Sequence, residues 1–469
     1  MKLTRRGFTT LAAVAVAGTV AACTGPTPSD EASPVGDPTT GAGTDPGTGS
    51  EATDAAPPAE GGGSFVYWSM WQEGENQQKV LADEIAKFTA ETGIAVEVQW
   101  SGREVLTQVV PRLNAGNPPD LVDNGAPDFE SRVGLDNMMD LSDLYDMEIP
   151  GEEGTKVSDV VPEALMASMQ KEGGEPFVVP YEITGATMFY NAALTPQFRD
   201  ATPATWDEFI AILDELKAAG RTPLALDGDI ADYCGYWVEW GVLRAGGPGT
   251  IVDAAQDATG EAFKSPAWVA GTDAIEQLIS GGYFPEGFRG TKFPTQQASW
   301  ADQSSQTDAI LMGTWLPSET TSSLEKSGGD PASIEFGSFP FPSVGENQGE
   351  GLVVAQPLGF GIPEKARNAD AAKQFVAYFM QKDRIGRIAT EAKNLTPRTD
   401  VEPPAELTDY FEEYKNASST VLFTDGVAAA EPKWVTDIWQ PALGEFFDGK
   451  LTAEQFRQQL ADKTAQHHG

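Results

Sequence analysis

The sequence predicts an α/β protein with two lobes, and two observations lead to that prediction. From Ser64 onward, segments with the apolar spacing of strands alternate with segments that have the apolar spacing of helices. A strand–helix–strand order implies a parallel sheet with right-handed crossovers. The residues from Ser64 to Gly469 are also too many for the single core of a typical domain of about 50–250 residues, so we expect two lobes.

The first elements after Ser64 follow this order. Leu81, Ile85 and Phe88 share one face of a helix, and Gly93 precedes a segment that alternates apolar and other residues at the strand period. The predicted elements are, in chain order, a strand over 65–71, a helix over 76–89, a strand over 94–100, a helix over 103–113 and a short strand at 121–122.

A capping box marks a later helix. Thr205 precedes Glu208 by three residues, the spacing at which the two side chains cap each other's backbone N–H groups, and Gly220 supplies the end of the helix. The other predicted elements are a helix over 370–380 and strands near 177–179, 310–312, 334–336 and 353–362.

Residues 1–22 predict an export signal. Lys2, Arg5 and Arg6 precede an apolar run over 11–20 that ends in small residues. A helix of this length spans about 15 Å, roughly half of a bilayer core, so the run is not expected to remain as a transmembrane anchor. Residues 4–8 resemble a twin-arginine signal, and general secretion stays open as the other route.

Cys23 follows the small residues, and this arrangement resembles the bacterial lipobox, in which the cysteine becomes lipid-modified and forms the new N-terminus. A plain cleaved signal with a chance cysteine is the alternative. Residues 23–63 are rich in Pro, Gly and acidic residues and contain no aromatic residue before Phe65. Such a composition cannot offset its ordering entropy, so we expect a lipidated Cys23 followed by a disordered linker, with or without glycans.

Composition excludes several classes of function. The chain carries 31 basic and 70 acidic residues, a net charge of −39, which makes nucleic acids and anionic lipid surfaces poor partners. Cys23 and Cys234 are the only cysteines, and His467 and His468, at the extreme C-terminus, are the only histidines. This excludes Ser-His-Asp triads, cysteine zinc sites and histidine metal sites in the folded body, so no cofactor and no metal are expected. Glycosidases that use only carboxylates remain.

The order of the segments resembles the family 1 extracellular solute-binding proteins, the carbohydrate-binding subunits of bacterial ATP-driven importers and the family of maltose-binding protein. Besides the lipobox, the resemblance rests on residues 68–71 (WSMW), 113–122 (LNAGNPPDLV), 176–181 (PFVVPY) followed by 188–191 (MFYN), 205–209 (TWDEF) and 312–315 (MGTW). The chain has Gly-Thr-Trp where Gly-Ser-Trp is commoner in the family.

The resemblance implies a type II periplasmic-binding-protein-like fold, in which hinge crossings join two α/β lobes around a ligand cleft. The implied N-terminal lobe comprises 64–184 and 345–400, and the C-terminal lobe comprises 185–344 and 401–469. It also implies a monomeric, non-enzymatic receptor on the extracellular face of the cell membrane, which binds a mono- or oligosaccharide and delivers it to the permease of an ABC transporter.

A sugar needs flat aromatic faces for its C–H patches and fixed polar groups for its hydroxyls. Candidate residues follow the predicted strands, where ligands of open α/β sheets collect, or match the family's motifs. The candidates for ligand contact are Trp68, Trp71, Glu73, Asp123, Asn124, Tyr181, Glu182, Tyr236, Trp237, Trp315 and Arg398.

Several candidates also have a purely structural interpretation. One of Trp68 and Trp71 can pack in the core, residues 123–125 can form an Asx turn, and Glu182 can pair with a base at the crossing. A helical core stripe explains Trp237 or Trp240, and Arg398 can be an ordinary surface arginine.

Two other functions stay open. A receptor for a non-sugar solute, such as a peptide, an osmolyte or a quaternary amine, would also use several tryptophans. A secreted glycosidase would need two carboxyls on either side of a glycosidic bond, which Glu73, Asp123 and Glu182 could supply.

Overall fold

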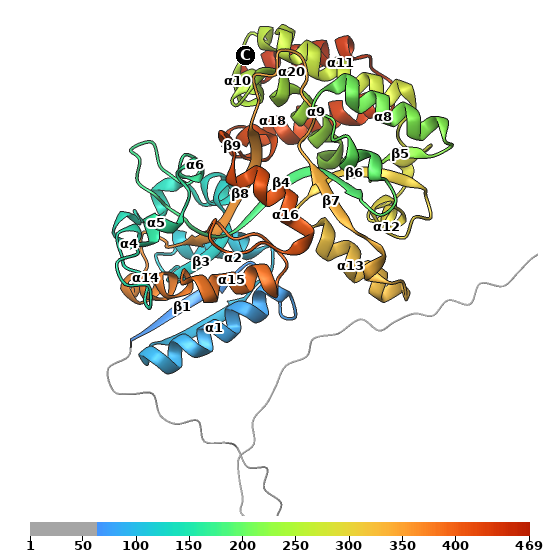
Figure 1. Cartoon of the computed structure of the whole chain (residues 1–469). Coiled ribbons are helices and arrows are strands. Elements are labelled where there is room, and N and C mark those ends of the chain that lie inside the picture. The colour runs from blue at the N-terminus through green and yellow to red at the C-terminus, as the bar shows by residue number, and fades with distance from the viewer. Residues whose placement is uncertain (1–62) are drawn as a thin grey trace, which may run out of the picture. The chain divides into compact units, whose positions relative to one another are not determined.

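Nine strands join into one mixed sheet in the part of the chain that the structure, a computed structural model, describes: residues 63–469 (Figure 1). Their order is β2-β1-β3-β8-β4-β6-β5, with β7 paired to β4 and β9 paired to β8. The strands are β1 (Ser64–Ser69), β2 (Ala95–Trp100), β3 (Leu121–Gly125), β4 (Val179–Asn191), β5 (Thr222–Ala225), β6 (Thr307–Gly313), β7 (Phe336–Phe339), β8 (Leu352–Gly361) and β9 (Ser419–Val421).

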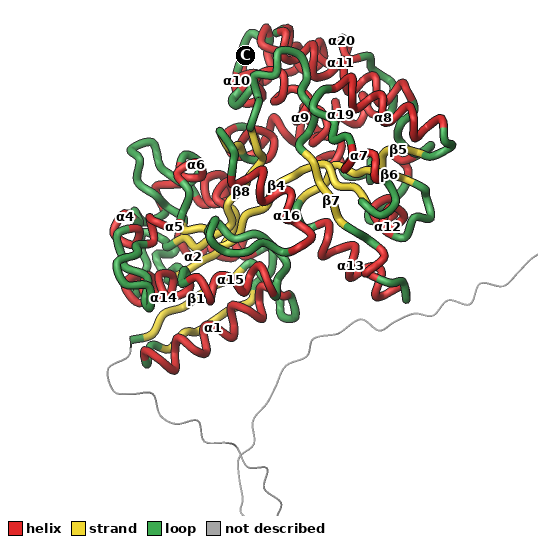
Figure 2. Tube along the Cα trace, in the orientation of Figure 1, coloured by secondary structure: helices red, strands yellow, loops and turns green. Residues whose placement is uncertain are grey.

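Helices connect these strands and lie around the sheet (Figure 2). In the first half of the chain they are α1 (Asn76–Thr92), α2 (Val105–Asn114), α3 (Ala126–Asp128), α4 (Ser142–Tyr145), α5 (Val157–Val160), α6 (Glu163–Met166), α7 (Pro196–Asp200) and α8 (Trp206–Ala218). They continue with α9 (Ala231–Gly246), α10 (Thr250–Gln256), α11 (Pro266–Gly281), α12 (Thr295–Ala301), α13 (Leu316–Ser327), α14 (Ala369–Phe379) and α15 (Lys382–Thr390). The last are α16 (Thr408–Lys415), α17 (Val427–Ala430), α18 (Pro432–Trp434), α19 (Gln440–Phe447) and α20 (Ala453–His468).

The pairing of the strands confirms the predicted parallel units. β1 pairs in parallel with β2 and with β3, and β5 pairs in parallel with β6. α1 and α2 are the crossovers between the first three strands, as the apolar spacing predicts. The predicted capping box is also present, because Glu208 N–H donates to Thr205 Oγ1 at 3.3 Å and Thr205 N–H donates to the Glu208 carboxylate at 3.1 Å.

Two long strands, β4 and β8, run through the middle of the sheet and link its two ends; we call them the crossing strands. The first half of β4 pairs with β8, which also pairs with β3, and its second half pairs with β6 and β7. Gly185 lies where these pairings change, and a Cβ there would fall 1.8 Å from the Tyr410 hydroxyl and 2.2 Å from the Val354 carbonyl oxygen. A glycine is therefore needed for the close approach of these chains. Figure 1 shows β1, β3 and α1 on one side of this crossing and β5, β6 and α8 on the other.

The alternation of side chains along β6 divides the apolar residues into two clusters. Ile310 and Met312 belong to the cluster that contains Phe65, Leu121 and other residues around β1 and β3. Ala309 and Leu311 point to the opposite face and belong to the cluster beneath α8, α9, α11 and α19. Both faces of β6 are therefore buried, as is typical of strands in α/β proteins.

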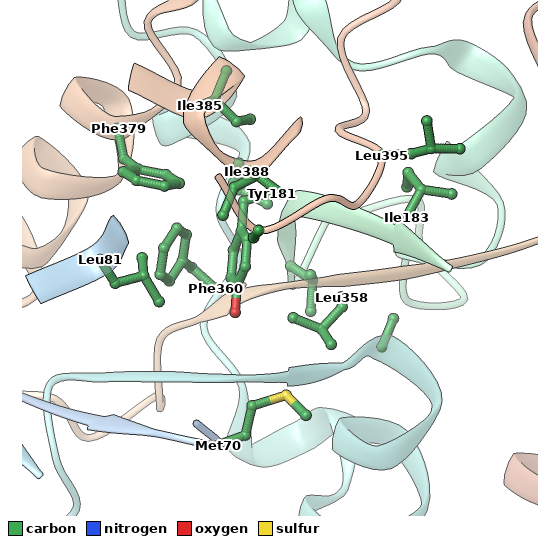
Figure 3. Packing of buried hydrophobic residues seen from close by; sticks show 14 of the residues in the cluster. Met70, Leu81, Tyr181, Ile183, Leu358, Phe360, Phe379, Ile385, Ile388 and Leu395 are labelled. Atoms are coloured by element: carbon green, nitrogen blue, oxygen red, sulfur yellow. The ribbon is translucent and has the colours of Figure 1, made fainter. Parts of the chain in front are cut away.

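Tyr181 and Phe360 belong to the first cluster and lie where β4 pairs with β8 (Figure 3). Their ring centroids are 4.6 Å apart, and Phe379 packs edge-on against Phe360 at 5.8 Å. Ile385 and Ile388 of α15 cover the same rings. Each fully buried apolar side chain contributes roughly 1.5–3 kcal/mol relative to exposure, so this cluster fixes α15 on the crossing strands.

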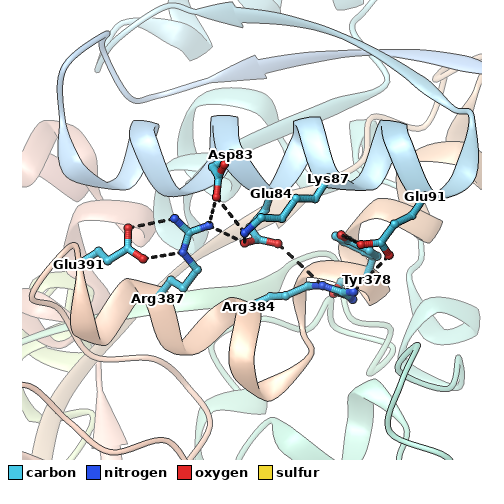
Figure 4. A network of polar contacts seen from close by, with 8 residues as sticks. All are labelled: Asp83, Glu84, Lys87, Glu91, Tyr378, Arg384, Arg387 and Glu391. Carbon is cyan, nitrogen blue, oxygen red and sulfur yellow. Dashed lines mark hydrogen bonds and ion pairs between the residues drawn. The ribbon is translucent and has the colours of Figure 1, made fainter. Parts of the chain in front are cut away.

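A network of charged side chains joins α1 to α15 (Figure 4). The Arg387 guanidinium lies 2.5 Å from one carboxylate oxygen of Glu84, whose side chain is 1% exposed, and it also pairs with Asp83 and with Glu391 at 2.6 Å. Hydrogen bonds that Arg387 donates to Glu391, Glu84 and Asp83 raise the pKa of Arg387 further above its ordinary value, so the cation is permanent. The network holds α1 against α15.

The predicted export signal, the lipidated Cys23 and the linker over 23–63 lie outside the described residues except for Gly63. Within 63–469, no helix combines the length and the apolar character that a membrane crossing requires.

Candidate ligand-binding site

Two cavities lie beside the crossing strands, and elements from both ends of the sheet contribute to each. The larger, cavity A, has a volume of about 780 Å³, and its lining includes Trp71, Gln77, Arg103, Glu182, Phe293, Gln297, Glu319 and Asn394. The smaller, cavity B, has a volume of about 500 Å³, and its lining includes Pro127, Thr184, Asp232, Tyr236, Trp315, Gln356, Phe423 and Thr424. Either volume is within the range of small-molecule sites.

Glu182 of β4 is a buried carboxyl group on the wall of cavity A. Gln77 Nε2, in the first turn of α1, donates to it at 3.2 Å, and Asn394 Nδ2 donates at 2.9 Å. Burial raises the pKa of Glu182 to about 8, so at neutral pH the side chain retains its proton. The side-chain oxygen Oδ1 of Asn394 is buried without a partner among the described residues. Glu182, Gln77 and Asn394 together thus offer both donors and acceptors to a polar ligand.

Trp71 lines the same cavity, and a chain of hydrogen bonds fixes its indole ring. Trp71 Nε1 donates to the Tyr181 hydroxyl at 2.7 Å, and that hydroxyl donates to the Asp123 carboxylate at 2.7 Å. Asp123 also accepts from the Tyr67 hydroxyl and from Met70 N–H, both at 2.7 Å. Burial raises the pKa of Asp123, partly offset by these bonds. Asp123 and Tyr181 therefore brace Trp71 from inside the core.

The guanidinium group of Arg103 packs against the face of the Trp71 ring. The Arg103 guanidinium carbon lies 4.4 Å from the indole centroid, a cation–π distance, and Arg103 Nη2 pairs with Glu75 at 2.9 Å. Arg103 also donates to the Met70 carbonyl oxygen at 2.7 Å. These contacts hold the loop after β1 over α2 and place a charged group at the edge of cavity A.

A row of aromatic rings runs between the two cavities. In cavity B, Phe423 lies 5.9 Å from Trp315 and 5.2 Å from Tyr236 between ring centroids. Tyr233 lies 5.7 Å from Tyr236 and 5.7 Å from Phe293, which belongs to the lining of cavity A. The row provides flat apolar faces along the wall that α9, α13 and the segment around Phe423 form.

The backbone around Phe423 is strained. In the 3₁₀ segment η7 (Phe423–Gly426), Thr424 and Asp425 have φ values of 52° and 53° in the left-handed region. The Asp425 carboxylate accepts hydrogen bonds from Gly249 N–H at 3.0 Å and Ile251 N–H at 2.9 Å, at the start of α10. Such conformations cost roughly 1–3 kcal/mol each and persist where the surroundings fix them, which is common at ligand sites.

Two of the candidates, Trp237 and Arg398, lie away from both cavities. Trp237 is fully buried and packs against Phe284 and Phe341 at 5.3 and 6.1 Å, because its side of α9 faces the core; it lines neither cavity. Arg398 is 3% exposed and pairs with Glu152 at 2.9 Å and Asp400 at 2.8 Å, so all of its charge is used within the protein.

Three further candidates also lie away from the cavities. Asn124 is buried in β3, and its side-chain oxygen accepts from Gly125 N–H at 2.8 Å. Trp68 is half-buried with the Arg112 guanidinium 5.7 Å from its ring. Glu73 is exposed in the loop after β1 and is absent from the lining of either cavity.

Of the candidates, Trp71 and Glu182 thus line cavity A, and Tyr236 and Trp315 line cavity B. Sequence reasoning missed Gln77, Arg103, Asn394, Phe293 and Phe423. Gln77 and Arg103 follow the first two strands closely, which could have indicated them, whereas no local pattern marks Asn394, Phe293 or Phe423.

Comparison with known proteins finds a matching family and several relatives of this chain. The family model of the bacterial extracellular solute-binding proteins matches residues 84–415. The diacetylchitobiose binding protein NgcE of Streptomyces coelicolor is 25% identical over 281 residues, which are 58% of this chain and 56% of that protein. The chain thus spans little more than half the length of NgcE. A probable sugar-binding periplasmic protein of Brucella suis is 23% identical over 403 residues, 84% of this chain and 89% of that protein.

Solved structures share the fold. The bacterial solute receptor AcbH, described as having an exclusive preference for β-D-galactopyranose, superposes with a TM-score of 0.70 at 17% identity, over 87% of this chain and 99% of that chain. This similarity confirms the predicted fold class, two α/β lobes of the periplasmic-binding-protein type. The predicted residue boundaries of the lobes stay a prediction.

Proposed function

Because this chain belongs to the bacterial extracellular solute-binding proteins, we propose that it is a receptor that binds a mono- or oligosaccharide between its lobes. The observation that carries the proposal is the row of aromatic rings beside buried amide and carboxyl groups on the walls of cavities A and B. The names of the relatives NgcE and the Brucella protein, both described as binding sugars, point the same way.

Aromatic rings suit the C–H patches of a sugar, and polar side chains suit its hydroxyls. Trp315, Tyr236 and Phe423 present flat faces on which the C–H patches of a pyranose can stack. Glu182, Gln77 and Asn394 present donors and acceptors that can hydrogen-bond its hydroxyls. These aromatic rings line cavity B and these polar groups line cavity A, but Trp71 and Phe293 give cavity A aromatic side chains of its own. A cavity that combines apolar faces with a few fixed polar groups gives both affinity and orientation.

Closure of the lobes would convert binding into a signal. Glu182 lies on β4, Trp71 follows β1 and Trp315 follows β6, so a ligand in the cavities touches elements on both sides of the crossing strands. A ligand shifts the protein toward a closed form only by binding that form more tightly. We propose that the closed form delivers the sugar to an ABC permease.

The matching family model and the named relatives, all of them binding proteins, favour a receptor over a glycosidase. Of the three carboxyl groups that the sequence offers for hydrolysis, only Glu182 lines a cavity, and it shares the wall of cavity A with Glu75 and Glu319. Arg103 pairs with Glu75, and the Gln297 amide donates to Glu319, so both of these carboxyl groups have partners within the protein. A glycosidase needs two carboxyls flanking one bond. The protein is therefore proposed to bind its sugar without changing it.

The composition of the first residues suggests the cellular location of the receptor. We propose that Cys23 is lipid-modified after export and tethers the protein, through the linker over 23–63, to the extracellular face of the bacterial membrane. The composition of residues 1–63 supports this proposal, and metabolic labelling with a fatty acid, lost in Cys23→Ser, would test it.

A thermal-shift panel tests the sugar assignment. Galactose, diacetylchitobiose, maltose and a chitin tetramer are added to the protein alongside glycine betaine and a tripeptide. We expect one of the saccharides to raise the unfolding midpoint, because a ligand that binds only the folded state stabilises it by RT ln(1 + [L]/Kd). A shift with betaine or the peptide but with no saccharide would contradict the proposal, and hydrolysis products from a bound oligosaccharide would favour the enzyme instead.

A further inference from the structure

We infer that Glu431, His467 and His468 form a binding site for a divalent transition-metal cation of the Zn²⁺ class. One ligand atom from each side chain, a carboxylate oxygen and two imidazole nitrogens, all lie within 4.8 Å of one another. Two histidines and one carboxylate are a ligand set that binds zinc and leaves a fourth position open for water. The inference is independent of the proposed sugar binding.

Both histidines lie on a packed helix. Although they end the sequence, α20 continues through His468, and Phe456 and Leu460 of that helix are fully buried. Trp434 Nε1 donates to Thr464 Oγ1 at 2.7 Å, one helical turn before His468. The structure thus differs from the expectation that these histidines lie outside the folded body, and α20 brings them to Glu431, between α17 and α18.

A hydrogen bond sets the tautomer of His468. Its Nε2 lies 2.8 Å from the carbonyl oxygen of Ala255 in α10. Because a carbonyl oxygen only accepts, Nε2 carries the hydrogen in the neutral ring and Nδ1 keeps its lone pair. Metal-bound histidines almost always donate their other N–H in this way, often to a backbone carbonyl, which orients the ring and raises its basicity.

The spacing of the other two ligands suits a shared metal. His467 Nε2 lies 3.5 Å from Glu431 Oε2, and both side chains are 24% exposed. Two ligands at about 2.0–2.2 Å from a tetrahedral zinc ion are themselves separated by roughly 3.3–3.5 Å. The distance is therefore long for a hydrogen bond and right for two ligands of one cation.

The type of ligand atom gives the site its selectivity. Imidazole favours Zn²⁺, Cu²⁺ and Ni²⁺ over Mg²⁺ and Ca²⁺, which prefer oxygen ligands. The net charge of −39 attracts any dication to the protein, so weak and unspecific binding to surface carboxylates is expected as a background. A specific site is distinguished from that background by its dependence on the two histidines.

Calorimetric titration of the full-length chain with zinc chloride tests the site, with magnesium chloride as a second probe. We expect one saturable zinc site per chain that magnesium does not fill. The variants His467→Ala, His468→Ala and Glu431→Ala should each weaken zinc binding by about tenfold or more. Glu454→Ala, an exposed carboxylate in the first turn of the same helix, is the matched control and should bind zinc like the unaltered chain.

Thermal unfolding without metal shows whether each variant is folded, and the midpoints should agree within a few degrees. Zinc should then raise the midpoint of the unaltered chain and of Glu454→Ala but not that of the histidine variants. Equal zinc affinity in all variants would overturn the inference by placing the metal elsewhere. The absence of saturable zinc binding to the unaltered chain would overturn it as well.

Discussion

The indole nitrogen of Trp71 donates a hydrogen bond to the Tyr181 hydroxyl at 2.7 Å. Trp71 lies in the loop after β1, and Tyr181 lies on β4, the strand that crosses the sheet. The bond therefore couples the orientation of a ring in cavity A to a residue at the crossing, and the Asp123 carboxylate behind it holds the hydroxyl in place.

Tyr181→Phe should destabilise the fold. The substitution leaves the buried Asp123 carboxylate with one donor fewer and the Trp71 N–H without an acceptor, and each unsatisfied buried group costs about 1–3 kcal/mol. We expect the free energy of unfolding in urea to fall by about 2 kcal/mol. Tyr283→Phe is the matched control: its hydroxyl donates to Asp214 near the surface, where water replaces it, so the loss should stay below about 1 kcal/mol. Equal losses in the two variants would contradict the bracing role of Tyr181.

Trp315→Ala should weaken sugar binding with little effect on stability. Trp315 is half-buried, lines cavity B and packs against Phe423. Loss of an aromatic anchor in a binding pocket costs about 2 kcal/mol, roughly a 30-fold rise in Kd, which calorimetry with the saccharide found in the panel would measure. Trp68→Ala removes an equally half-buried indole outside both cavities and should leave Kd unchanged. Retained affinity in Trp315→Ala, with a large fall in unfolding midpoint, would make Trp315 a packing residue.

Glu182 should make the protein less stable as pH rises from about 4.5 to 8. Its pKa is about 8 in the folded protein and 4.5 ordinarily, so in this interval the folded protein holds a proton that the unfolded chain has released. Raising the pH therefore favours the unfolded chain, with a slope of at most about 1.4 kcal/mol per pH unit. Below pH 4.5 both states hold the proton and the contribution is constant.

Glu182→Gln isolates this contribution, because an amide does not titrate and Glu413, whose pKa burial also raises to about 8, stays in both proteins. We expect the stability of the variant relative to the unaltered chain to increase steadily between pH 5 and 8, measured by urea unfolding. A difference that does not change with pH would show that Glu182 titrates at its ordinary pKa.

Arg387→Ala should loosen α1 from α15. It removes the closest partner of Glu84, a carboxylate whose side chain is 1% exposed, and within residues 63–469 it leaves only Lys87 at 2.9 Å and Arg384 at 3.8 Å. Breaking a buried pair costs about 3–5 kcal/mol, and the remaining cations reduce this to about 2 kcal/mol in chemical denaturation. The exposed pair of Lys264 and Glu261 supplies the control, since Lys264→Ala should change stability by less than about 0.5 kcal/mol.

The sequence predicted the helices and strands whose apolar residues recur at a single helical or strand period. The amphipathic helices α1, α8 and α14 and the strands β1, β2 and β3 were expected within a few residues of their bounds, because their apolar spacing is local. β4 was expected only as a short strand near 177–179, whereas it extends over Val179–Asn191. Nearly all of its residues are buried on both faces, so it has no alternation for a periodicity argument to detect.

The site was predicted less well than the fold for a similar reason. Trp71 and Trp315 could be expected at the cavities because each follows a strand, but which face of α9 is buried depends on packing with distant elements, so Tyr236 and Trp237 could not be told apart. Phe423 reaches cavity B because the Asp425 carboxylate anchors its loop to the start of α10, a contact across 176 positions of sequence. No local pattern encodes such a contact.

β4 contributes hydrogen bonds to β8 with one half of its length and to β6 and β7 with the other. Neither half of the molecule can lose its sheet without pulling apart the strand that serves both, so melting should proceed as one cooperative transition, with coincident curves from probes at either end. Separate expression of the halves would leave each with a truncated sheet edge and a tendency to aggregate.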